Sequence, residues 1–261
     1  MSKAGIKGRY SLHGIVLLIA VWYAAAFVLQ SPVVPLPHRV AVNLVQQLQR
    51  LTTYRHIAAS LYRILCGTVL ALLTGIPVGI AAGRSRMLDN TITPLLYLLY
   101  PVPKIALLPV FMVLLGIGDL AKISLIAVII FFPIAVSIRD AVGRLSHEYL
   151  ELARMLHLSQ AAILRSIIIP GILPSVFSTL RISLGISLSV LFISENIASG
   201  HGLGFAIMNS WIMADYLGMY TGIVLLSLSG IGLYQGVDQL ERRCTPWRQL
   251  PYTPAERDSP A

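Results

Sequence analysis

Charged residues are scarce in this chain. Lys, Arg, Asp and Glu make up 12% of its 261 residues, whereas a soluble globular domain carries about a quarter. Hydrophobic residues make up 56%, and the mean hydropathy is +0.76. A helix of roughly 20 apolar residues crosses the hydrocarbon core of a bilayer. The composition therefore predicts an all-α polytopic membrane protein with no sizeable domain outside the lipid.

Residue patterns of catalytic and metal sites are also lacking. The two cysteines, Cys66 and Cys244, lie far apart in the sequence, so we infer neither a disulfide nor a metal site. The six histidines have no ligand-like spacing. The sequence contains no G-x-x-x-x-G-K-[ST], G-x-S-x-G or H-E-x-x-H motif. We therefore expect a chain that binds no cofactor and is not a membrane-embedded enzyme.

Hydropathy along the chain predicts six transmembrane helices, at residues 13–29, 56–82, 92–115, 120–138, 163–197 and 217–238. The first resembles a cleaved signal peptide. We interpret it as a retained anchor, because its removal would leave five spans with the two termini on opposite sides. Residues 1–12 are then a cytoplasmic N-terminus, 13–240 a six-helix transmembrane domain, and 241–261 a polar cytoplasmic tail that we expect to be disordered.

Basic residues indicate the orientation, because Lys and Arg are enriched in cytoplasmic loops. With the N-terminus inside, the outer segments hold only Arg39, Arg50, Arg55 and Lys122, and the inner segments hold most of the other basic residues outside the spans. Both termini should therefore face the cytoplasm. Anionic lipid attracts such inner loops, which explains the net charge of +9 without nucleic acid as a partner.

Small residues recur at every fourth position of the second predicted span. A stripe of this kind lets two helices approach closely in lipid. Prolines interrupt the second and third spans, and broken helices are tolerated where protein or a water-filled cavity satisfies the backbone. This pattern indicates a pathway, although kinks that only shape the packing remain an alternative. The stripe consists of Gly67, Ala71, Gly75, Gly79 and Gly83.

We single out four of the charged residues within the predicted spans, because charges there are costly and usually face protein or water. Arg63 and Glu195 lie toward the outer end, and we expect them to pair. Lys104 and Arg181 lie near mid-depth without an obvious carboxylate partner. We interpret these two as favouring an anion in the pathway. The alternative is that they snorkel or cap backbone carbonyls at proline breaks.

A short amphipathic helix is predicted at residues 147–158, on the cytoplasmic surface. Ser146 is suited to cap it, and polar residues follow at 148, 151, 154 and 157. Apolar residues form the opposite stripe at helical spacing. An interfacial helix that only anchors a loop to lipid would show the same pattern. The apolar stripe consists of Tyr149, Leu152, Ala153 and Leu156.

Residues 151–170 resemble the cytoplasmic EAA loop of permease subunits of ABC importers. That pattern is E-A-A, three residues, G, nine residues, then I-x-L-P. Glu151, Leu152 and Ala153 stand at E-A-A, and nine residues separate His157 from Ile167. His157 replaces the glycine, whose backbone freedom histidine has only at a cost. We expect either a turn that avoids the left-handed conformation or two helices that run on continuously.

Further stretches extend the resemblance over roughly residues 40–240. LPVFMVLLGIGDLAKI, IIIPGILPSVFSTLRISLG and SENIASGHGLGFAIMNS all look like nitrate, sulfonate, taurine or bicarbonate importer permeases. The resemblance implies a type I importer fold with six helices, in the inner membrane of a bacterial cell. It also implies a second permease copy, an extracytoplasmic binding protein, and two ATPase subunits that carry ATP and Mg.

In such permeases the helix at 147–158 contacts the ATPase, which makes this chain a non-catalytic subunit. The implied contact residues are Glu148, Glu151, Leu152, Ala153, Arg154, Leu156 and His157. Basic residues at mid-depth favour an oxyanion as the substrate, and a vitamin or vitamin precursor is the alternative. A secondary transporter is disfavoured, because we find no internal repeat of the kind such proteins often show.

Overall fold

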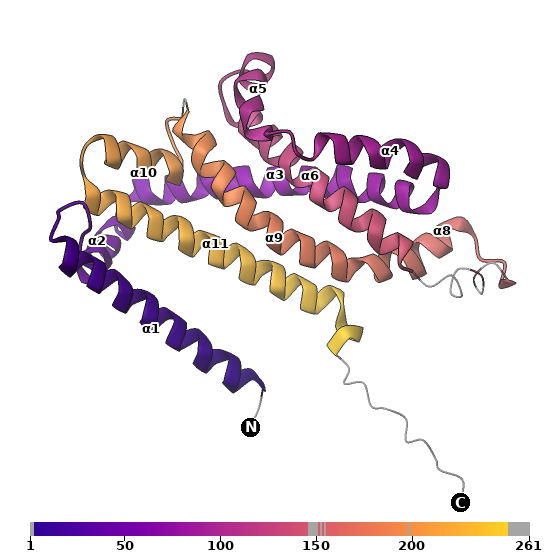
Figure 1. The fold of residues 1–261 in the computed structure, drawn as a ribbon, viewed down its shortest axis with the longest axis horizontal. Coiled ribbons are helices and arrows are strands. Elements are labelled where there is room, and N and C mark those ends of the chain that lie inside the picture. Colours follow the sequence, from indigo (N-terminus) through magenta and orange to yellow (C-terminus); the bar gives the residue numbers. More distant parts are fainter. Residues whose placement is uncertain (1–2, 146–150, 152, 154, 198, 250–261) are drawn as a thin grey trace, which may run out of the picture. The chain divides into compact units, whose positions relative to one another are not determined.

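The computed structural model describes residues 3–145, 151, 153, 155–197 and 199–249, and every regular element in these residues is a helix (Figure 1). The predicted all-α class is therefore confirmed. Three short helical turns are η1 (Lys104–Leu107), η2 (Leu164–Ile168) and η3 (Pro246–Gln249), of which η2 is a π-turn. The α-helices are α1 (Lys3–Leu29), α2 (Pro37–Leu48), α3 (Leu51–Arg84), α4 (Arg86–Leu99), α5 (Leu108–Leu115), α6 (Asp119–Gly143), α8 (Gln160–Ile163), α9 (Ile169–Asn196), α10 (Leu203–Ile212) and α11 (Tyr216–Cys244).

Four helical segments are long and apolar enough to cross a membrane: α3, α6, α11 and the continuous stretch Gln160–Asn196. A bent pair, α4 with Lys104–Leu115, makes a fifth span if it is counted as one. The apolar part of α1, His13–Leu29, is shorter. Helices of the described chain thus cover the six predicted regions to within a residue, except for the break at residues 100–103 of the third, and α1 begins ten residues before its predicted start.

The third predicted span, 92–115, is not one continuous helix. The axes of α4 and of the following segment differ by 87°. The break contains Pro101 and Pro103. Proline lacks a backbone N–H and disfavours helical conformation in the residue before it, so two prolines in succession end the helix. Pro77, by contrast, lies inside α3, which continues past it.

The chain forms two compact units. Unit 1 comprises residues 1–66, 108–124 and 188–230, and unit 2 comprises residues 67–107, 125–187 and 231–261. The long helices α3, α6, α9 and α11 each contribute one part to either unit. Each unit is described by itself below.

In unit 1, side chains tie α1, α2 and α11 together. The indole N–H of Trp22 donates to the carbonyl oxygen of Pro35 at 3.1 Å, and its ring stacks on Tyr220 with centroids 5.5 Å apart. The Thr221 hydroxyl donates to the side-chain oxygen of Asn43 at 2.9 Å. These contacts hold the short helix α2 and the loop before it against α1 and α11.

In unit 2, α3 packs against α6 through the glycine stripe. A Cβ atom on Gly79 would lie 2.7 Å from the carbonyl oxygen of Ala135, so only glycine permits this approach. A Cβ atom on Gly75 or Gly83 would lie 2.9 or 2.7 Å from a side chain of α6. Close backbone contact of this kind is how small residues associate helices in lipid. The facing side chains repeat the same spacing and are Ile134, Ile138 and Val142.

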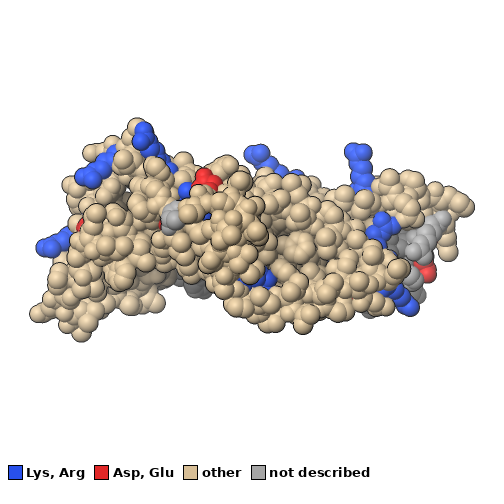
Figure 2. All heavy atoms as spheres, turned by 90° about the horizontal axis from the view of Figure 1, so that it is seen from above, with Lys and Arg blue, Asp and Glu red and all other residues tan. Residues whose placement is uncertain are grey.

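Much of the surface is apolar. Side chains such as Val28 and Val113 are more than four-fifths exposed. Figure 2 shows that Lys, Arg, Asp and Glu occupy a small part of the visible face. Exposed apolar area of this extent marks membrane or protein contact rather than contact with water.

Candidate functional site

The segment predicted to contact an ATPase is described only in part. Glu148, Leu152 and Arg154 lie outside the described residues. Glu151 is helical and exposed, whereas Ala153 is 2% exposed. The next two described residues, Met155 and Leu156, are 73% and 63% exposed. The described part therefore has one face buried within this chain and an apolar group open to a partner.

This helix ends at a left-handed turn. His157 has φ +53°, and the Leu158 N–H donates to the carbonyl oxygen of Ala153 at 3.0 Å. A bond of this span closing over a left-handed residue is the Schellman pattern of helix C-termini. Both expectations for His157 are wrong, because the turn keeps the conformation for which the EAA pattern uses glycine. Histidine enters this region more often than most residues other than glycine.

A new helix starts immediately after this turn. The Ser159 hydroxyl accepts a hydrogen bond from the Ala162 N–H at 3.2 Å and caps α8. From Gln160 the chain remains helical to Asn196. The sequence placed this second helix three residues later. The cap explains its earlier start, because a serine hydroxyl satisfies one of the free N–H groups in the first turn.

Glu195 lies at the centre of a buried polar cluster in unit 1. Its side chain is 0% exposed and accepts from the guanidinium of Arg63 at 2.5 Å. The Ser60 hydroxyl donates to the same carboxylate at 2.9 Å, and the Gly204 N–H donates at 2.8 Å. The structure thus brings Arg63 and Glu195 together as expected. A buried carboxylate is stable only with such partners.

Arg63 has a second carboxylate partner that the sequence analysis missed. Its Nε atom donates to Asp119 at 2.8 Å, and its Nη1 atom donates to the backbone carbonyl of His201 at 2.8 Å. Lys122, expected in an outer segment, is instead 1% exposed within α6 and donates to the Ser199 hydroxyl. Its signal in the sequence is its position one helical turn after Asp119, at the start of an apolar run.

We call Ser60, Arg63, Asp119, Lys122 and Glu195 the Arg63 cluster. Its two positive and two negative side chains give a formal charge of zero. A neutral set of this kind holds the ends of α3, α6 and α9 in unit 1 together. It presents no excess charge with which to attract an ion.

The glycines after Glu195 serve this cluster. Gly202 has φ +137°, and a Cβ atom there would lie 2.3 Å from the Glu195 carboxyl carbon. The Gly202 N–H donates to Nδ1 of His56 at 3.1 Å. Glycine is therefore required both by the backbone conformation and by the space above the carboxylate. The loop closes over Glu195 and leads into α10.

Arg181 lies in unit 2 and is neutralised. Its Nε atom donates to Asp238 at 2.7 Å, and its Nη2 atom donates to Glu241. Both carboxylates belong to α11. The expectation that Arg181 lacks a carboxylate partner is therefore wrong. The partners follow Arg181 by 57 and 60 residues, so neither the periodicity nor the depth of α9 revealed them.

Lys104 follows the proline break and has a different environment. Its Nζ atom donates to the carbonyl oxygen of Tyr100 at 2.8 Å. The same atom lies 4.3 Å from the centroid of the Phe132 ring, within the range of a cation–π interaction. These contacts match the alternative role, the capping of a carbonyl that the break leaves without its helical partner.

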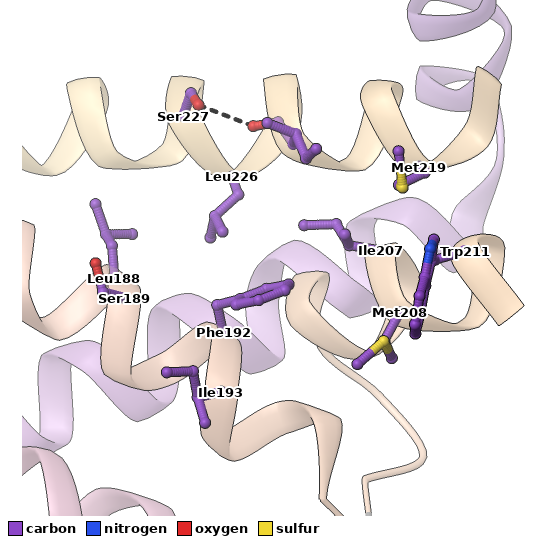
Figure 3. Close-up of a pocket in the computed structure, with 11 residues that line it drawn as sticks. Leu188, Ser189, Phe192, Ile193, Ile207, Met208, Trp211, Met219, Leu226 and Ser227 are labelled. Carbon is purple, nitrogen blue, oxygen red and sulfur yellow. Dashed lines mark hydrogen bonds between the residues drawn. The ribbon is translucent and has the colours of Figure 1, made fainter. Parts of the chain in front are cut away.

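An apolar groove opens between α9, α10 and α11 of unit 1. Its volume is about 720 Å³. Figure 3 shows Phe192 of α9, Ile207 of α10 and Leu226 of α11 directed into the space between these helices, with Trp211 at the far end. The Ser227 hydroxyl donates to the carbonyl oxygen of Ile223 at 2.9 Å. The groove has no charged lining residue among those described and suits contact with another apolar surface.

Comparisons with known proteins agree with this fold. Residues 75–246 match the profile of the "binding-protein-dependent transport system inner membrane component" family. The chain is 36% identical over 244 residues to the taurine transport system permease protein of Escherichia coli (strain K12), covering 91% of this chain and 89% of the relative. It is 28% identical over 251 residues to a putative aliphatic sulfonates transport permease protein of Bacillus subtilis (strain 168), covering 94% and 91%.

A solved structure gives the same picture of the fold. The inward-facing MetNI methionine ABC transporter matches with a TM-score of 0.64 and 20% identity, over 74% of this chain and 95% of the matched chain. The likeness confirms the type I importer permease fold. Neither the secondary transporter nor the membrane enzyme fits these matches. This chain belongs to the family of binding-protein-dependent transport system inner membrane components and is the permease subunit of an ABC importer.

Proposed function

We propose that this permease imports a small sulfonate such as taurine, with ATP and Mg bound by two separate ATPase subunits. The observation that carries the substrate class is the 36% identity to a taurine permease over 91% of the chain. The sequence has no phosphate-binding loop of its own, which supports a separate motor. An extracytoplasmic binding protein delivers the substrate and sets most of the specificity.

The contact with the ATPase is formed by the helix at residues 147–158. Met155 and Leu156 expose a neighbouring pair of apolar side chains, and Glu151 adds a polar group. Ala153, which the resemblance implies as a contact residue, is instead buried within this chain. Closure of the ATPase subunits then moves the helix as a rigid body and shifts the permease helices.

The test uses proteoliposomes that contain the permease, its ATPase and its binding protein. Glu151→Lys should leave membrane insertion unchanged but lower taurine uptake at least tenfold, because it reverses the charge at the contact. The matched control is Arg243→Glu, which reverses the charge of an exposed residue of α11 outside this segment. Uptake by Glu151→Lys at the level of the control would overturn the proposed contact.

Lys104 is the pathway residue that we retain. Arg63 and Arg181 are neutralised by carboxylates, whereas among the described residues Lys104 contacts a carbonyl oxygen and aromatic rings. A cation that forms no ion pair within the described part of the chain attracts a sulfonate. Lys104→Gln should therefore lower taurine uptake, and Arg86→Gln, which removes an exposed arginine from α4, should not. Equal uptake by the two variants would remove Lys104 from the pathway.

A second copy of the permease covers the apolar groove of α9, α10 and α11. Trp211 is 56% exposed and Ile193 is 43% exposed on this face, which gives an aromatic anchor of the kind that dominates protein interfaces. In a variant without Cys66 and Cys244, Met208→Cys should form a disulfide-linked dimer. Val28→Cys, on the exposed surface of α1, should not. Dimers from both or from neither would argue against this interface.

The orientation completes the proposal: both termini lie in the cytoplasm. It is supported by the excess of Lys and Arg in the predicted inner segments. A reporter that is active only outside the cytoplasm, fused after residue 261, should be inactive. The same reporter inserted after Arg50, in the short connection between α2 and α3, should be active.

A further inference from the structure

A second groove lies in unit 2, between α3 and the segment that runs from η2 into α9. Its volume is about 750 Å³. Ile76 and Ile80 of α3 form one wall, and Leu164, Ile172 and Leu173 form the other. None of these residues belongs to the Arg63 cluster, to the groove of Figure 3 or to the segment at 147–158. The function proposed above leaves this groove without a role.

The groove is apolar along its length and basic at one end. Its lining on α3 runs from Ile76 to Arg84, which is about 12 Å of helix. Arg84 is the last residue of α3 and the only charged lining residue among those described. The opposite wall, from Leu164 to Val176, extends over about 18 Å. The space is thus long and apolar, with an exposed arginine near one end.

The chain is irregular where the groove meets Arg84. Arg84 donates a hydrogen bond to the side-chain oxygen of Gln160, which holds the guanidinium beside the start of α8. The helix then widens into the π-turn Leu164–Ile168, whose first residue lines the groove. Single π-turns inside long helices are rare and are found frequently at functional sites.

We propose that this groove binds one anionic phospholipid, with an acyl chain between α3 and α9 and the phosphate on Arg84. A guanidinium has five N–H donors, of which the bond to Gln160 uses one, and its planar fork matches phosphate oxygens. Basic pockets between transmembrane helices are known to hold anionic head groups. The described lining includes no Asp or Glu that would repel the phosphate.

A second copy of the chain fits this groove less well. A two-fold contact uses the same patch on both subunits, so it would bring two basic ends to one interface. The described lining provides no carboxylate to neutralise them. A phospholipid supplies both the apolar chain and the negative charge in one molecule.

The test measures retained lipid on the assembled transporter. The complex is reconstituted with equal amounts of phosphatidylglycerol and phosphatidylcholine, extracted in mild detergent and analysed by native mass spectrometry. The unaltered protein should retain phosphatidylglycerol in preference. Arg84→Gln should lower that preference about tenfold, because a charge-assisted hydrogen bond is lost. Ala81→Phe, which fills the groove, should lower retention of both lipids.

Matched controls make the same chemical changes elsewhere. Arg243→Gln removes an exposed arginine from α11, and Ala24→Phe adds a ring to an exposed position of α1; both should leave retention unchanged. Equal retention by Arg84→Gln and Arg243→Gln would overturn the proposal. So would disulfide-linked permease dimers formed by Ala81→Cys in a protein without Cys66 and Cys244, because a second copy would then occupy the groove.

Discussion

The Arg63–Glu195 pair of unit 1 and the Arg181–Asp238 pair of unit 2 have the same chemistry in different surroundings. The Arg63 and Glu195 side chains are 6% and 0% exposed, whereas those of Arg181 and Asp238 are 21% and 36% exposed. Their N–O distances are similar, at 2.5 and 2.7 Å. The two pairs therefore differ in burial rather than in bond geometry.

Burial changes what such a pair does. An isolated charge in an apolar interior is so costly that a buried pair cannot open without a large penalty. A partly exposed pair opens more easily, because water replaces the lost partner. The Arg63 cluster is thus suited to fix the ends of its helices, and the Arg181 pair is suited to a contact between α9 and α11 that changes during transport. The following predictions, from the largest effect to the smallest, test this difference.

Glu195→Gln should have the largest effect. It removes the buried carboxylate partner of Arg63, and breaking a buried ion pair typically costs about 3–5 kcal/mol of folding free energy. The measurement is the free energy of unfolding of the purified permease in a denaturing-detergent titration.

A double substitution checks the reason for that loss. Arg63→Met with Glu195→Met removes both charges and should recover most of the stability, because apolar replacements of a buried pair are often tolerated. A double variant as unstable as Glu195→Gln would show that shape, rather than charge, decides the effect.

Gly202→Ala should have the second-largest effect and lower the free energy of unfolding by about 1–3 kcal/mol. The new methyl group would press on the Glu195 carboxylate, and the backbone is left-handed at this position. The matched control is Gly236→Ala in α11, where nothing lies within 4 Å. The control should gain about 0.5–1 kcal/mol, because alanine favours a helix. A similar loss in both variants would contradict the role assigned to Gly202.

Asp238→Asn should lower the free energy of unfolding by about 1 kcal/mol, because water and Glu241 still interact with Arg181. Its main effect should appear in the ratio of taurine transported to ATP hydrolysed, measured in proteoliposomes. A stability loss as large as that of Glu195→Gln would erase the distinction between the two pairs.

Asp119→Asn should have the smallest effect and lower the free energy of unfolding by roughly 0.5 kcal/mol. Asp119 belongs to the buried cluster, yet its side chain is 47% exposed. Raising the salt concentration should remove the difference from the unaltered protein, because salt screens exposed charges. A loss that persists at high salt would place Asp119 with the buried members of the cluster.

Several features were predictable from local patterns. The apolar stretches predicted helices in all six regions, and the four-residue repeat of small residues predicted that α3 packs closely against another helix. The pairing of Arg63 with Glu195 followed from their similar predicted depth. Each inference used the length or periodicity of one segment, which the local sequence carries.

Other features were not predictable in this way. The carboxylates of Asp238 and Glu241 reach Arg181 only because of how α11 is rotated against α9. Lys122 is buried at the start of α6, where its side chain donates a hydrogen bond to Ser199. The left-handed conformation of His157 depends on the hydrogen bond that closes over it. The environments of Arg181 and Lys122 depend on contacts between separate segments, so no single segment encodes them.

The sequence by itself determined that this protein is a bundle of lipid-spanning helices with one closely packing face and an EAA-like cytoplasmic segment. Only the tertiary structure decided which charged side chains form ion pairs, that Gly202 lies over the Glu195 carboxylate, and that Arg84 lies beside an apolar groove. The physical reason is that helical periodicity defines a face on each helix. The partner of that face depends on the rotation and register of another helix, which are set by the packing of the whole unit.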